Sequence, residues 1–294
     1  MVTVEGGSEE TRPSLRARFA DLAVRVVSAV ILVLVMVVLL WWGEIPFMVG
    51  IALIVAGGLW ELYSTFARHG YRPAAAVSLA AGCGLPVVAY FITRSEEGEL
   101  TPLAILLVLY IPVLLAWVLF GRHSQSPTTD MAISLLGVVL VGFSLSHFVL
   151  MLRFDQVSWT APFAVIVMVW VYDAVAYFAG SAFGRHKMAP RISPGKSWEG
   201  TAAGTAGAFL AAYILQVTLR RDWLTVAVAM ELAALVSVFG PLGDFSESMV
   251  KRELGVKDMS SLIPGHGGIM DRFDSMFLTA VVCYYFLRYL IVKA

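Results

Sequence analysis

The residues best suited to chemistry lie between positions 242 and 274. On a helix, Asp244, Ser248 and Lys251 would lie at i, i+4 and i+7 and would share one face. A carboxylate, a hydroxyl and an ammonium on one stripe suit a magnesium-bound phosphate, because carboxylates bind the hard cation and ammonium groups bind phosphate oxygens. The alternative is a solvated helix end with an internal ion pair. It is disfavoured because Asp244 lies next to an apolar span, where a charged side chain is energetically costly and usually has a function.

A second pair of carboxylates begins the last apolar run of the chain. Asp271 and Asp274 lie three residues apart and would occupy one helical turn. Such a pair can bind a divalent cation, although acidic residues also favour helix N-termini for structural reasons. Gly267 and Gly268 precede them and would allow the backbone to approach a ligand closely. His266 has no second His at a metal-binding spacing, so a hydrogen-bonding loop role is its plainer interpretation.

A third group of polar residues surrounds the end of another apolar run. Asp173 and Tyr177 lie one helical turn apart, and an acid inside a membrane span marks a functional site by default. Lys196 and Ser197 follow, at the point where we expect a helix to begin. Basic and hydroxyl groups at a helix N-terminus form an anion site. A single Lys-Ser pair is a weak signal, which becomes stronger if both polar segments face the same side of the membrane.

These residues must be positioned by membrane-spanning helices. Of the 294 residues, 59% are apolar and 14% are charged, whereas soluble domains carry roughly 25% charged residues. The mean hydropathy of +0.80 agrees, so a water-soluble or disordered protein is excluded. Each span needs about 20 apolar residues, and we therefore predict an all-α polytopic membrane protein with nine spans, near residues 22–42, 46–63, 74–93, 101–120, 131–151, 161–183, 201–218, 224–241 and 275–292.

The positive-inside rule predicts the orientation of these spans. With a cytoplasmic N-terminus and an outer C-terminus, 14 of the 21 Lys and Arg residues lie in inner segments, five in outer segments and two within spans. We expect a cytoplasmic tail over 1–21, five spans over 22–160, and a catalytic membrane region over 161–294. The last region would carry cytoplasmic loops at 184–200 and 242–274. Glycines at the start of the seventh span, Gly200, Gly204 and Gly207, would allow tight helix packing.

The polar segments resemble the signature of a known enzyme family. The run from Ser248 to Asp274 fills about fifteen fixed positions in the signature of the phosphatidate cytidylyltransferases, also called CDP-diacylglycerol synthases. The segments Ser193–Gly200 and Asp173–Gly180 are also similar to this family. The resemblance is close over about 170–275 and only general over the N-terminal spans.

The resemblance implies that CTP and phosphatidate react to give CDP-diacylglycerol and pyrophosphate, with magnesium as the cation and the number of metal ions left open. It also implies three groups of site residues. The expected metal ligands are Asp244, Asp271 and Asp274. The residues expected to act in catalysis are Lys196, Ser197, Ser248, Lys251, Arg252, His266 and Arg272. The residues expected to bind substrate are Asp173, Tyr177, Lys257, Gly267, Gly268 and Glu199.

The resemblance further implies a multi-pass protein of the inner (plasma) membrane, with the active site facing the cytoplasm. A homodimer is an expected assembly, and a nucleic-acid partner is not expected.

Three other functions stay open at this stage. A CTP-dependent polyprenol or dolichol kinase would use similar residues but transfer the γ-phosphate. A cytidylyltransferase for isoprenoid glycerophosphates would differ only in the lipid tails. A secondary transporter is suggested by the acids Asp173, Glu61 and Glu231 in or near spans, but it would keep its function without Asp271 or Lys251 and leaves the loop signature unexplained.

Overall fold

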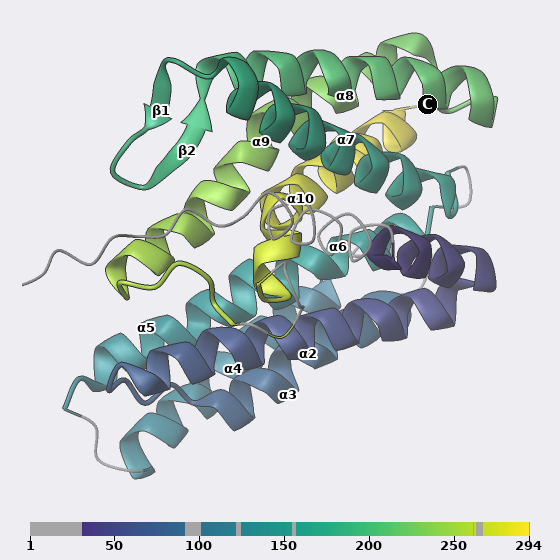
Figure 1. Cartoon of the computed structure of the whole chain (residues 1–294). Coiled ribbons are helices and arrows are strands. Elements are labelled where there is room, and N and C mark those ends of the chain that lie inside the picture. Colours follow the sequence, from purple (N-terminus) through teal and green to yellow (C-terminus); the bar gives the residue numbers. More distant parts are fainter. Residues whose placement is uncertain are drawn as a thin grey trace, which may run out of the picture.

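The computed structural model describes residues 31–91, 101–121, 125–154, 157–260, 262 and 267–293. It consists of helices and one short hairpin, arranged as two groups of helices with α10 between them (Figure 1). The predicted N-terminal tail and His266 lie outside the described residues.

The first group of helices comes from the N-terminal half of the chain. After helical residues 31–42 it contains α2 (Glu44–Arg68), α3 (Ala75–Phe91), α4 (Thr101–Phe120), α5 (Pro127–Gly137) and α6 (Ser144–Met151). A π-helical turn, Val138–Phe143, joins α5 to α6, so these two helices form one continuous rod. The sequence did not predict this turn. It lies where Gly142 meets α3 so closely that a Cβ would be 2.9 Å from the Cα of Gly82.

The second group of helices carries most of the polar residues. It contains α7 (Thr160–Phe183), α8 (Trp198–Leu219) and α9 (Val226–Glu253), and α10 (Met270–Lys293) packs against it. Between α7 and α8, strands β1 (Lys187–Ala189) and β2 (Ser193–Ser197) form an antiparallel hairpin. The all-α prediction therefore holds for the fold, with this hairpin as a small exception inside the expected loop.

Helix α9 is longer than the sequence suggested. It continues through Pro241 and ends at Glu253, so the connection expected to begin at residue 242 begins at 254. The helix persists because its polar segment is buried against α10: Glu247 has no exposed surface and Ser248 is 7% exposed. The prediction that Asp244, Ser248 and Lys251 lie on one helix is confirmed.

Tight glycine packing joins α7 and α8, as predicted. A Cβ at Gly200 would lie 2.7 Å from the carbonyl oxygen of Ala176, and one at Gly204 would lie 2.9 Å from that of Tyr172. At Gly207 a Cβ would lie 2.9 Å from Cγ2 of Val175. The two backbones therefore approach more closely than any larger residue would allow.

Six helical segments of the described chain are long and apolar enough to cross a membrane. They cover 44–68, 103–120, 127–151, 160–183, 198–219 and 226–253. Two shorter apolar helices cover 31–42 and 75–91. The chain is thus a helical, multi-pass membrane protein.

Candidate functional site

Helices α9 and α10 approach each other closely beside the predicted carboxylates. A Cβ at Gly243 of α9 would lie only 2.3 Å from the carbonyl oxygen of Asp274 in α10. Glycine at this position lets the two backbones touch. The side chains of the next turns, Asp244 to Lys251 on α9 and Asp271 to Ser275 on α10, are therefore brought together.

Lys251 links the two helices through two carboxylates. Its Nζ lies 2.7 Å from Oδ1 of Asp271 and 3.1 Å from Oε2 of Glu247. All three side chains are well buried, with exposed fractions of 13% for Lys251, 4% for Asp271 and 0% for Glu247. The ammonium group therefore holds two carboxylates that would otherwise repel each other.

The hairpin contributes the second ammonium group. Nζ of Lys196, on β2, lies 2.7 Å from Oδ2 of Asp244 and 4.7 Å from the ring centroid of Phe245. The hydroxyl of Ser248 donates to Oδ1 of the same Asp244 at 3.1 Å. Arg252 fixes the hairpin from the other side, because its Nε donates to the carbonyl oxygen of Ile192 at 2.9 Å.

Asp173 brings α7 into the same cluster. It accepts a hydrogen bond of 3.2 Å from the hydroxyl of Ser275, whose backbone N–H donates to Oδ1 of Asp274 at 2.7 Å. The charges of Asp244 and Asp274 both act on Asp173. We refer to the residues that meet here as the carboxylate cluster, namely Asp173, Lys196, Asp244, Glu247, Ser248, Lys251, Asp271, Asp274 and Ser275.

The composition of the carboxylate cluster suits a divalent cation. Its five carboxylates outnumber its two ammonium groups, which leaves an excess of three negative charges if all are ionised. Oε1 of Glu247 is buried and has no hydrogen-bond partner in the part of the chain that the structure describes. Within those same residues, no three side chains converge as a complete set of metal ligands. Magnesium does not need such a set, because it binds one or two carboxylates and completes its shell with water and substrate phosphates.

Asp271 is oriented by backbone groups as well as by Lys251. Its Oδ2 accepts from the N–H of Gly268 at 2.8 Å and from the N–H of Met259 at 3.2 Å. Gly267 has a φ of +80°, which favours glycine. The two glycines predicted to approach a substrate thus have a visible role in shaping the turn around Asp271.

Two predicted residues support the hairpin and lie apart from the carboxylate cluster. Ser197 is 2% exposed and caps α8, because its Oγ accepts from the N–H of Gly200 at 3.2 Å. Glu199 accepts from the backbone N–H groups of Arg185 and His186, and it contacts Nδ1 of His186 at 2.6 Å. The structure therefore gives both residues a role in holding the hairpin on α8, and their catalytic and substrate-binding roles stay predictions.

The remaining predicted residues surround the cluster without joining it. Tyr177 is 61% exposed and packs edge-on against Phe178. Lys257 and Arg252 are exposed, and Arg272 is half-buried directly after Asp271. Their contacts with a substrate stay predictions.

Sequence reasoning did not assign two carboxylates and one hydroxyl to the site. Glu247 lies three residues after Asp244 and four before Lys251, so its helical spacing could have placed it on the same face. Ser275 directly follows the two aspartates of α10. Glu61 of α2 binds the segment just before α10, and no sequence pattern indicates this contact across 208 residues.

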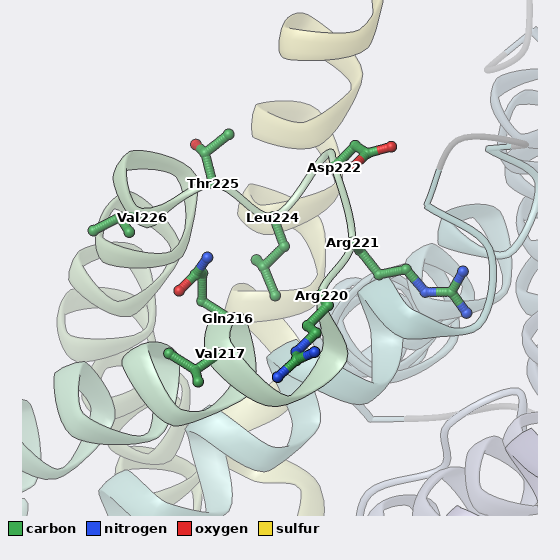
Figure 2. A pocket seen from close by; sticks show the side chains of 8 residues that line it. All are labelled: Gln216, Val217, Arg220, Arg221, Asp222, Leu224, Thr225 and Val226. Carbon is green, nitrogen blue, oxygen red and sulfur yellow. The ribbon is translucent and has the colours of Figure 1, made fainter.

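A pocket at the other end of α8 contains none of the predicted site residues. It has a volume of about 600 Å³ and lies where α8 turns into α9 (Figure 2). It is lined by Gln216, Val217, Arg220, Arg221, Asp222, Leu224, Thr225 and Val226. Because α8 has 22 residues, it separates this pocket from the hairpin by about 33 Å, at 1.5 Å per residue.

Comparisons of the sequence with known proteins identify its family. Residues 23–290 match the Cytidylyltransferase family. The chain is 31% identical over 277 residues to a phosphatidate cytidylyltransferase of Bacillus subtilis (strain 168), an alignment that covers 91% of this chain and 97% of the relative. It is 30% identical over 288 residues to the phosphatidate cytidylyltransferase of a Synechocystis species, covering 89% and 95%. A shorter match to the Pseudomonas aeruginosa enzyme of that name is 47% identical over 119 residues, covering 40% and 43%.

Proposed function

The chain belongs to the Cytidylyltransferase family, and we propose that its carboxylate cluster is the place where it transfers the cytidylyl group of CTP to phosphatidate. The products are CDP-diacylglycerol and pyrophosphate. One observation carries the assignment of the site: Lys251 bridges Glu247 and Asp271 at 3.1 and 2.7 Å, at the point where α9 and α10 meet. A reaction between two phosphate anions needs cationic groups to bind the phosphates and carboxylates to hold a metal ion, and this site contains both.

The reaction is a displacement at the α-phosphorus of CTP. A phosphate oxygen of phosphatidate forms a new bond to that phosphorus, and the bond to the β-phosphate oxygen breaks, so that pyrophosphate leaves with the electron pair. The nucleophile is already anionic, and a strong general base is not needed. The difficulty is to bring two polyanions together and to stabilise the charge that develops on the leaving group.

The side chains of the cluster meet that difficulty in two ways. Lys196 and Lys251 supply ammonium groups for phosphate oxygens. Asp244 and Asp271 are the proposed magnesium ligands, with Asp274 beside them, and the unpartnered Oε1 of Glu247 supports the need for a cation here. Magnesium would neutralise phosphate charge and orient the reacting groups.

The proposal includes a membrane arrangement with nine spans, a cytoplasmic N-terminus and an outer C-terminus. The charge bias of the sequence supports it, because it places the hairpin and the start of α10 on the inner side. The site would then face the cytoplasm, where CTP is found, in the inner membrane of the cell. The Lys187→Cys variant, on the hairpin, should react with an impermeant maleimide in inside-out vesicles but not in intact cells. Labelling in intact cells would show that the hairpin faces the outside and that the proposed orientation is wrong.

A homodimer is the last element of the proposal. Light scattering of the purified protein in detergent should give twice the protein mass of 32.0 kDa. A protein mass of one chain at all concentrations would remove the dimer from the proposal.

The activity is tested by pyrophosphate release from the purified protein in mixed micelles. CTP, magnesium and phosphatidate are each omitted in turn, and we expect release only when all three are present, together with a CDP-lipid. Formation of CDP from CTP with a polyprenol acceptor would instead identify a kinase. If no CTP reaction occurs with any lipid, the function is wrong and transport assays follow.

The site is tested by Asp244→Asn and Asp271→Asn. We expect either substitution to abolish turnover while the protein still elutes as a folded species. Asp222→Asn, in the turn between α8 and α9, is the matched control and should keep wild-type activity. A near-normal rate in either cluster variant would remove that residue from the metal ligands.

A further inference from the structure

One stripe of α2 contacts two segments that precede Asp271, namely Met259–Ser260 and Gly268–Met270. Glu61, Thr65 and Arg68 lie at i, i+4 and i+7 and therefore face the same side of the helix. This helix belongs to the N-terminal half of the chain, outside the polar segments that the sequence singled out as the site. We call these three residues the α2 stripe.

Glu61 binds the start of α10 with both of its carboxylate oxygens. Oε1 accepts from the N–H of Ile269 at 2.8 Å and from the hydroxyl of Ser260 at 2.6 Å, and Oε2 accepts from the N–H of Met270 at 2.9 Å. The first N–H groups of a helix have no partner within the helix. Glu61, which is fully buried, therefore caps α10 from another helix, and its negative charge suits the positive end of the helix dipole.

Thr65 and Arg68 bind the other segment. The hydroxyl of Thr65, 1% exposed, donates to the carbonyl oxygen of Met259 at 2.8 Å. Nη2 of Arg68 donates to the same oxygen at 3.4 Å and to Oγ1 of Thr65 at 2.8 Å. The N–H of Met259 is one of the two backbone donors to Asp271.

The second backbone donor to Asp271 is also fixed by the α2 stripe. Gly268, which donates to Oδ2 of Asp271, packs directly on Glu61, because a Cβ there would lie 2.5 Å from Oε2 of Glu61. Both donors to Oδ2 are therefore held against α2. The other oxygen of Asp271 faces Lys251 and the rest of the carboxylate cluster.

From these contacts we propose that Glu61 is a positioning residue for the cation-binding carboxylate of Asp271, acting through the backbone of Gly268–Met270 and supported by Thr65 at Met259. The inference rests on the proposed function, because it takes Asp271 as a magnesium ligand. It adds that a buried acid of the N-terminal half sets how well the C-terminal site binds magnesium.

Glu61→Gln is the test substitution, because it keeps the shape of the side chain. A glutamine amide has one acceptor oxygen, so its NH2 group must face the N–H of Ile269 or of Met270 and at least one hydrogen bond is lost. Substitution of residues that orient metal ligands typically weakens metal binding or activity by about 10- to 100-fold. We expect the magnesium concentration for half-maximal pyrophosphate release to rise by that factor, with the rate restored by excess magnesium.

Two readouts are measured on the full-length protein in detergent. The first is the rate of pyrophosphate release against magnesium concentration. The second needs no substrate: it is the rise in melting temperature on adding magnesium alone, which should require about 10- to 100-fold more magnesium in Glu61→Gln than in wild type. Glu44→Gln is the matched control, since Glu44 lies on the same helix but pairs with Arg153 at 2.9 Å, and it should titrate as wild type.

A second pair of variants covers the case in which Glu61→Gln does not fold. Thr65→Val loses the hydrogen bond to Met259 and should also raise the magnesium requirement, whereas Thr65→Ser keeps the hydroxyl and should restore it. A rate that falls by the same factor at every magnesium concentration, with an unchanged thermal titration, would show a merely structural role and overturn the inference. If Asp271→Asn stays active, the proposed site itself is wrong. If Asp271→Asn is inactive but Glu61→Gln and Thr65→Val titrate as wild type, only the α2 inference fails.

Discussion

Replacing Lys251 by methionine removes the ammonium group that joins α9 to α10. Methionine keeps most of the length of the side chain but leaves Glu247 and Asp271 facing each other without their shared cation. Both carboxylates are nearly inaccessible to water, with exposed fractions of 0% and 4%, so solvent cannot screen the repulsion. The stability of Lys251→Met therefore measures the cost of leaving these two buried carboxylates without their shared cation.

The size of the effect follows from this burial. Removing one partner of a buried ion pair costs about 3–5 kcal/mol, because the remaining charge stays buried and unpaired. For 294 residues the entropy of unfolding is about 0.6 kcal/mol/K, so each kcal/mol lowers the melting temperature by about 1.6 °C. Lys251→Met should thus unfold roughly 5–8 °C below wild type.

The assay is thermal unfolding in detergent with a chelator present, followed by intrinsic fluorescence. Lys257→Met is the control, because Lys257 is exposed and surface substitutions change stability by only about 0.5 kcal/mol. Adding Glu247→Gln to Lys251→Met removes one of the two carboxylate charges and should recover at least about 1 kcal/mol, within the usual range of coupling between contacting residues. A single variant that melts within 2 °C of wild type, or a double variant that melts below the single one, would refute the reasoning.

Two further substitutions test the packing around the site. Gly243→Ala would place a Cβ 2.3 Å from the carbonyl oxygen of Asp274, so α9 and α10 must separate. We expect the free energy of unfolding to fall by about 1–3 kcal/mol and the turnover rate to decrease. An unchanged melting temperature and turnover rate would contradict the close approach of the two helices. Ser197→Ala removes the cap of α8 and should cost about 1 kcal/mol, seen as a fall of about 1–2 °C in melting temperature. The Ser197→Thr variant keeps a capping hydroxyl and should melt closer to wild type; equal melting of both variants would show that the cap contributes nothing.

The fold could be predicted where hydrophobicity alone decides the structure. Apolar runs placed most helices within a few residues, because burial of the backbone in a membrane leaves helices as almost the only option. The end of α9 was predicted too early. Its segment from Asp244 to Glu253 carries enough polar residues to look like a loop, and only packing against α10 shows that Glu247 and Ser248 are buried.

Only the site residues that share one face of α9 could be predicted from the sequence. The periodicity that joined Asp244, Ser248 and Lys251 is a local property of the sequence. The pairing of Lys196 with Asp244 was not predictable, since the β-hairpin that carries Lys196 was expected only as a loop. The role of Glu61 could not be predicted either, because two of its three partners are the backbone N–H groups of Ile269 and Met270, which have no signature in the sequence.

The contact between Glu61 and α10 has a consequence for how the protein is made. The carboxylate and the N–H group of Met270 are separated by 209 residues. At a synthesis rate of about 5–20 residues per second, α2 leaves the ribosome roughly 10–40 s before the N–H groups that it will cap. During this interval the nascent chain contains Glu61 but not yet the backbone donors that orient Asp271. The enzyme would thus be inactive until α10 has inserted and packed against α2.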